Sequence, residues 1–242
     1  TSTTVVDADR VVMNDNGTMV QVAVTDLAAY FDDEITAMPN LVTIGATQQL
    51  TTLAGIPFYS DSTSLYTHNV SGTDSTATHN TAIGFTAMDA ITTGDNTTAL
   101  GYGALGANTT GYNNTAVGSN ALILNSTGNE NVGIGSYSLD ANTTGGLNTA
   151  IGHNSLGANS TASNNTAVGN SALKANTTAG DNVAVGHNAM LTNSTGNNNV
   201  AVGKDALKTN ATTNNNTALG NSALFTNVGS ENTGLGGTSM YS

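Results

Sequence analysis

The side chains that could carry acid–base chemistry are few and scattered along this sequence. Seven carboxylates fall at several different places of a repeating pattern: Asp89, Asp95, Glu130, Asp140, Asp181, Asp205 and Glu231. Glycoside hydrolysis needs two carboxylates roughly 5–10 Å apart in one cleft. Asp181 and Glu130 share a place in the pattern, but three periods separate them. We therefore expect surface acids, no catalytic residue and no enzyme.

Histidines and glycines provide no better site. His153 and His187 occupy one place of the pattern two periods apart, about 9.6 Å if periods stack at the spacing of β-strands. That is too far for one metal ion within a chain, although three symmetry-related copies near an axis could bind one. The run Gly101-Tyr102-Gly103 lacks the Gly-Lys-Ser/Thr of a phosphate-binding loop. We expect no cofactor and no metal.

All these residues lie in an internal repeat that positions them. A motif of the form Asn-Thr-Ala-(Val/Ile/Leu)-Gly, with substitutions at its first three places in some copies, recurs ten times between Asn80 and Gly236, with a period of 17 residues and a last interval of 16. This period suits two short strands with a turn after each, and Thr, Val and Ile favour strands. We predict an all-β fold in which 80–242 forms a parallel β-solenoid of about ten coils, roughly 43 Å long.

One row of the repeat is large and apolar. Four residues past each glycine stands Leu or Met, which we expect inside the coil. The row is Met88, Leu105, Leu122, Leu139, Leu156, Leu173, Met190, Leu207, Leu224 and Met240. A second row is small, because the residue two before each glycine is Ala or Gly. Since side chains alternate along a strand, this row forms a separate face.

The small row predicts an interface between chains. One coil buries too few apolar side chains to offset the entropy of ordering its backbone, so it needs neighbours. We interpret the small face as the surface where three chains approach one another. The predicted trimer interface is Ala82, Ala99, Ala116, Gly133, Ala150, Ala167, Ala184, Ala201, Ala218 and Gly234.

Two rows of asparagine accompany the motif. One is Asn108, Asn125, Asn142, Asn159, Asn176, Asn193, Asn210 and Asn227, and the other runs from Asn114 to Asn232 at the start of each motif. Stacked amides can hydrogen-bond from coil to coil, and Asn tolerates the left-handed conformations of tight turns. Several of these residues also read as N-glycosylation sequons, which we interpret as by-products of the ladder.

The motif followed by a small residue and Leu resembles the head repeats of trimeric autotransporter adhesins of the YadA type. It is also similar to repeats of bacteriophage fibres and other virion proteins. The resemblance covers about two thirds of the chain. It implies a left-handed parallel β-roll that assembles as a homotrimer.

The chain before the repeats has a different composition. In residues 1–38, two apolar runs flank Asn14-Asp15-Asn16-Gly17, which predicts a hairpin, and a short helix is expected from Asp26 to Glu34. By resemblance to the leaders of phage fibres, this module attaches to other virion proteins; a trimer-nucleating cap is the alternative. Residues 39–79 form a transition segment, uncharged between Glu34 and Asp61 and expected to be buried between chains.

Charge and hydropathy narrow the class of partner. The chain has 242 residues, no cysteine, and a net charge of −12 with only four basic residues. This argues against nucleic acid and anionic membranes as partners. The sequence has no run of 18 apolar residues and no basic signal peptide, so we expect no membrane insertion. The resemblance then favours a virion over a bacterial cell surface.

Three functions remain open. The first is a trimeric structural virion protein, as fibre, spike or capsid decoration. The second is an adhesin-type module that recognises host glycan or protein through exposed residues: Phe85, Tyr102, Tyr112, His153, His187, Lys204 and Phe225. The third is an ice-binding solenoid, which predicts a flat outward Thr-x-Thr face. The outward threonines are expected instead in turns, as at Thr109-Thr110.

Overall fold

A computed structural model describes residues 76–239 together with six short strands before them. The chain divides into two compact units, Thr1–Leu50 and Thr51–Ser242. The transition segment expected at 39–79 is therefore shared between the units. The described residues contain no helix, and so none that is long and apolar enough to cross a membrane.

The first unit contains an antiparallel strand pair. Strands β1 (Arg10–Asp15) and β2 (Thr18–Ala23) pair from Arg10 opposite Ala23 to Asp15 opposite Thr18. This is the pairing that a hairpin at Asn16-Gly17 requires. The helix expected from Asp26 to Glu34 lies outside the described residues.

The second unit begins with four short strands. They are β3 (Thr52–Leu53), β4 (Ile56–Pro57), β5 (Tyr59–Ser60) and β6 (Leu65–Tyr66). β3 pairs antiparallel with β4, and β5 pairs antiparallel with β6. β6 then pairs parallel with the first strand of the repeats and buries Tyr66. This strand thus starts the parallel sheet that the repeats continue.

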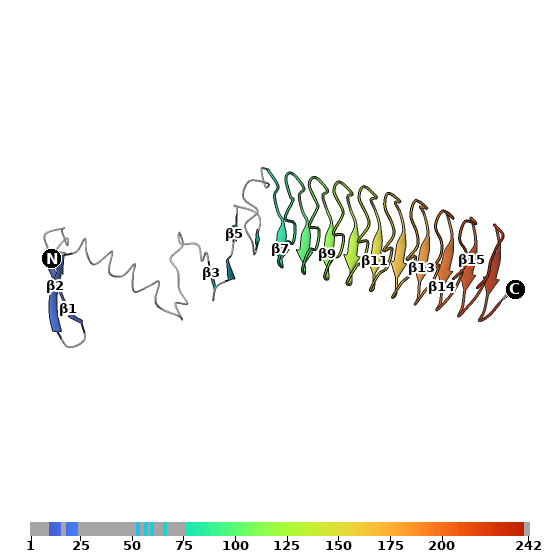
Figure 1. Cartoon of the computed structure of the whole chain (residues 1–242). Coiled ribbons are helices and arrows are strands. Elements are labelled where there is room, and N and C mark those ends of the chain that lie inside the picture. Colours follow the sequence, from blue (N-terminus) through green and yellow to red (C-terminus); the bar gives the residue numbers. More distant parts are fainter. Residues whose placement is uncertain are drawn as a thin grey trace, which may run out of the picture. The chain divides into compact units, whose positions relative to one another are not determined.

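The repeats form a parallel β-solenoid, as the period predicts (Figure 1). Its strands are β7 (Thr81–Ile83), β8 (Thr98–Leu100), β9 (Thr115–Val117), β10 (Val132–Ile134), β11 (Thr149–Ile151), β12 (Thr166–Val168), β13 (Val183–Val185), β14 (Val200–Val202), β15 (Thr217–Leu219) and β16 (Thr233–Leu235). Each strand pairs in parallel with the equivalent strand of the next coil, so Ala150 lies opposite Ala167. The sequence period is therefore the length of one coil.

Each coil contains one strand, and the prediction of two strands per coil is wrong. The rest of the coil is a series of turns at positive φ. In the coil that starts at β11, Gly152 has φ +134°, and Asn154, Leu156 and Asn164 have φ of 59°, 51° and 63°. A buried leucine in this region is unusual, because left-handed backbone costs an ordinary residue roughly 1–2 kcal/mol. Burial of the leucine side chain stabilises the fold by roughly 1.5–3 kcal/mol, which offsets this cost.

The interior of the coil is thin and holds a large row and a small row of side chains. The described members of the large row, from Met88 to Leu224, are at most 1 % exposed, which confirms that they lie inside. The Ala row lies inside as well and packs against them. At Gly133, an added Cβ would lie 3.2 Å from Cδ1 of Leu122, so only Ala or Gly fits opposite the leucine. Met240, the last of the large row, lies outside the described residues.

This packing corrects the predicted trimer interface. The residues assigned to it are buried within a single chain: Ala82, Ala99, Ala116, Gly133, Ala150, Ala167, Ala184, Ala201, Ala218 and Gly234. They cannot meet another chain, because the leucines of their own coils already cover them. The small face of the strand is the inside of the coil, and the β-branched and aliphatic face is the outside.

Both asparagine rows form the predicted ladders. In the first, Asn159 Nδ2 donates to Asn142 Oδ1 at 2.9 Å and to the carbonyl of Ala162 at 3.1 Å, while Asn176 Nδ2 donates to Asn159 Oδ1 at 2.9 Å. In the second, Asn148 donates its backbone N–H to Asn131 Oδ1 at 3.0 Å. These amides are buried, so each partner lost would leave a polar group unsatisfied at about 1–3 kcal/mol. A buried amide is also unavailable as a glycosylation acceptor in the folded chain.

Candidate functional site

The outward face of the parallel sheet is an uncharged strip, which we call the outer strip. It comprises the first and third residues of every strand from β7 to β16, and none of them is buried. The first residue is Thr in seven strands and Val in three. The third is Ile83, Leu100, Val117, Ile134, Ile151, Val168, Val185, Val202, Leu219 and Leu235.

The outer strip leaves large aliphatic side chains in contact with water. Ile83 is 41 % exposed, Leu100 45 % and Leu219 51 %. With nine intervals of about 4.8 Å and about 7 Å between its two columns, the strip covers roughly 300 Å² in projection. The largest apolar patch on a typical soluble protein is about 300–600 Å² and is often functional, and here the aliphatic column supplies the apolar part of the strip. Among the described residues, the strip is therefore the surface best suited to contact another protein surface.

The outer strip differs from the face expected for ice binding. Its threonines do point outward, whereas outward threonine was expected only in the turns. However, each Thr is followed two residues later by Val, Ile or Leu, as in Thr149 and Ile151, and not by a second Thr. The Thr-x-Thr arrangement that defines the ice-binding hypothesis is absent from the described strands.

The carboxylates of the repeats remain separate. Glu130 and Asp181 share one turn position, at φ of 57° and 59°, and both are exposed on coils three periods apart. Within residues 76–239, no three His, Asp or Glu side chains are placed to hold a metal ion. His153 and His187 are both exposed at equivalent positions.

Asp140 is half-buried between the turns of neighbouring coils. Burial raises its pKa, against the backbone hydrogen bond and the electrostatic interactions with His153 and Lys174, which lower it. Its Oδ1 atom has no hydrogen-bond partner.

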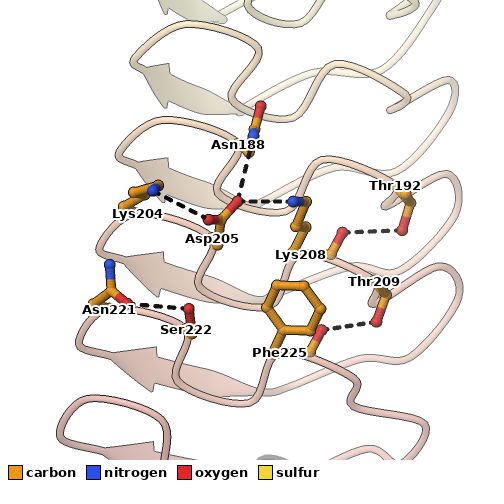
Figure 2. A network of polar contacts seen from close by, with 9 residues as sticks. All are labelled: Asn188, Thr192, Lys204, Asp205, Lys208, Thr209, Asn221, Ser222 and Phe225. Carbon is orange, nitrogen blue, oxygen red and sulfur yellow. Dashed lines mark hydrogen bonds and ion pairs between the residues drawn. The ribbon is translucent and has the colours of Figure 1, made fainter.

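Asp205 is the centre of a polar network on the later coils, shown in Figure 2. Its Oδ1 lies 3.0 Å from Lys208 Nζ and accepts a hydrogen bond from Asn188 Nδ2 at 3.3 Å. Although burial acts to raise the pKa of Asp205, these hydrogen bonds and the charges of Lys208 and Lys204 hold it below its usual value. Lys208 also lies 5.3 Å from the ring centre of Phe225. The network joins three coils, and all the contacts described are made between residues of one chain.

The residues predicted for surface recognition do not form one site. Phe85 and Tyr102 come together, with nearly parallel rings whose centres are 6.2 Å apart. Lys204 lies beside Asp205, 3.9 Å from its Oδ2 atom, and the ring of Phe225 faces Lys208. Tyr112 is exposed on a different turn, the one that precedes the motif. The seven residues are thus divided among three positions of the coil.

Tyr137 is an exposed aromatic residue that the sequence analysis did not select. Its ring meets that of His153 edge to face, with centres 6.3 Å apart. It stands two residues past a glycine, one place beyond Phe85 and Tyr102 in the repeat. In the turn after the repeat glycine, only the residue directly after the glycine was predicted to take part in recognition, and Tyr137 lies one place further along.

Comparison with protein-family models, curated proteins and solved structures finds no match to this chain.

Proposed function

We propose that this chain is a structural, non-enzymatic virion protein in which three solenoids pack along their outer strips to form a projecting rod. The observation that carries the proposal is the outer strip itself, an uncharged face with a column of mostly Thr and a column of aliphatic side chains repeated on ten strands. Such a regular surface pairs well with another regular surface of equal period. Threefold assembly and the location on a virion follow from the resemblance of the repeat to fibre and adhesin repeats.

The solenoid has the properties that a projecting rod needs. Backbone hydrogen bonds link each coil to the next, as from Val183 to Asn199 at 2.8 Å, and the asparagine ladders add side-chain bonds along the same axis. In repeat proteins each unit is stabilised by its neighbours, so coils in the middle are held from both sides. We assign attachment to other virion proteins to residues 1–38, where seven of the sixteen acids are concentrated.

The alternative location is a bacterial cell surface. Immunogold electron microscopy with an antibody against the solenoid tests the location on particles and cells that carry the protein. The proposal predicts gold on projections of the particle. Gold on the cell envelope but not on particles would favour the alternative, and gold confined to the cell interior would contradict a role as an external projection.

A further inference from the structure

A row of aromatic rings follows the corner of the coil just after the repeat glycines. Phe85 is 73 % exposed and Tyr102 56 % exposed, and Tyr137, at 43 %, lies against the exposed His153. We call these four residues the aromatic track. They come from the first, second, fourth and fifth coils of the repeat. At about 4.8 Å per coil, the track is roughly 19 Å long.

The fold does not require rings at these positions. The residue after the repeat glycine is Ser119 in the coil of β9, Ser136 in the coil of β10 and Asn170 in the coil of β12. The position of Tyr137 is taken by Ser171 in another coil, with almost the same φ, 57° against 56°. Because small polar residues serve equally well in the turn, the exposed rings add nothing that the coil needs. Exposed apolar rings without a packing role mark recognition surfaces.

Apart from Asp140, which interacts electrostatically with His153, the turn positions that carry the track are uncharged. None of the first five coils has Asp, Glu, Lys or Arg at the two positions after its glycine. A nucleic acid or an anionic membrane would need basic residues there. A protein partner would have to reach well beyond the track, which is only one or two residues wide. A linear, neutral ligand with alternating apolar and polar surfaces fits these constraints.

We infer that the aromatic track binds an uncharged, extended oligosaccharide. The ring faces of Phe85 and Tyr102 would stack on the C–H faces of sugar rings, whose spacing along an extended chain is similar to the spacing of the coils. Exposed polar side chains between the ring pairs, such as Ser119, offer hydrogen bonds to sugar hydroxyls. The rings of the track lie in the turn after the repeat glycine, two residues or more beyond the strand residues of the outer strip.

The test measures binding of the full chain to a printed array of neutral and acidic oligosaccharides, followed by titration with the soluble neutral glycan that binds best. We expect binding to neutral oligosaccharides of three or more sugars, with little dependence on salt. The double variant Phe85→Ser/Tyr102→Ser should lose at least about tenfold in affinity, as the loss of two stacked rings implies. The variant Tyr137→Ser/His153→Ser should weaken binding of longer glycans more than of short ones.

Tyr112→Ser is the matched control. It removes a ring of 43 % exposure from another turn, at a position where Ser163 occurs naturally, and should leave affinity unchanged. The inference is overturned if the full chain binds no neutral glycan, or if Tyr112→Ser weakens binding as much as the track variants do. It is also overturned if the track variants change the sedimentation mass and leave glycan binding intact, because the rings would then belong to a contact between chains.

Discussion

Replacing Leu173 by Asp is expected to unfold the middle of the solenoid. Leu173 is fully buried in the interior of the coil. A carboxylate there would be removed from water with no positive partner, a change that typically costs about 4 kcal/mol or more. Because each coil is stabilised by the coils stacked on it, destabilising the coil of Leu173 should also destabilise its neighbours. Circular dichroism during thermal or denaturant unfolding should show a large loss of stability or an unfolded chain.

Leu147→Asp is the control for this prediction. Leu147 is 57 % exposed, and its turn position is occupied by Asp181 in another coil with the same φ to within 1°. The same change of residue should therefore be tolerated there. If Leu173→Asp and Leu147→Asp unfold at the same midpoint, the large row does not form the interior of the coil.

Replacing Gly152 by Ala is expected to be nearly as damaging, although it adds a single methyl group. At φ +134°, the backbone is in a region that side chains rarely adopt, and a Cβ would lie 2.5 Å from the carbonyl oxygen of Gly169 in the next coil. That oxygen belongs to the backbone of the stack and cannot rotate away. Strain of this kind costs about 1–3 kcal/mol before the collision is counted. We expect a loss of at least about 3 kcal/mol in equilibrium denaturation.

Gly133→Ala provides the matched comparison. This glycine lies in the interior Ala row, and its added Cβ would meet side-chain atoms of Ser138 and Leu122 at 3.1–3.3 Å. Side chains can shift by the few tenths of an ångström needed, and Ala is the residue at this position in eight of ten coils. Stability should change little. Equal losses of stability for Gly152→Ala and Gly133→Ala would show that contact between coils is not what requires glycine at the end of each motif.

Much of the solenoid could be predicted because comparison of the ten copies of the repeat shows which positions accept only certain types of residue. The period defines the coil, the Leu or Met row identifies an interior position, and rows of Asn predict amide ladders. The direction of the Ala row could not be obtained in the same way. Alternation along a strand separates Ala150 from Ile151, yet it does not say which of the two faces the interior. Small residues fit both a close contact between chains and a thin interior filled from the opposite side by Leu.

The number of strands per coil could not be predicted, because leucine adopts an unexpected backbone conformation in the turns. Leu156 and its equivalents adopt positive φ, which sequence rules assign to Gly, Asn or Asp. The two strands per coil were predicted from the length of the 17-residue period, and a Leu at this position does not indicate that the chain turns there. The candidate site was hidden for a related reason. The outer strip consists of ordinary Thr, Val, Ile and Leu, and only their exposure in the folded coil distinguishes them from a core.

Sedimentation of the wild-type chain and two variants at micromolar concentration tests most directly whether the outer strip joins the chains. Ile151→Lys/Val168→Lys adds two charges to the strip, and Thr144→Lys/Thr161→Lys adds two charges to an exposed turn. We expect the wild type and the turn variant to sediment at three times the 24.2-kDa mass of the chain. The strip variant should sediment as a folded monomer, because facing lysines would repel one another across an apolar contact. A wild-type chain that sediments as a stable monomer, or a strip variant that remains trimeric, would contradict the account.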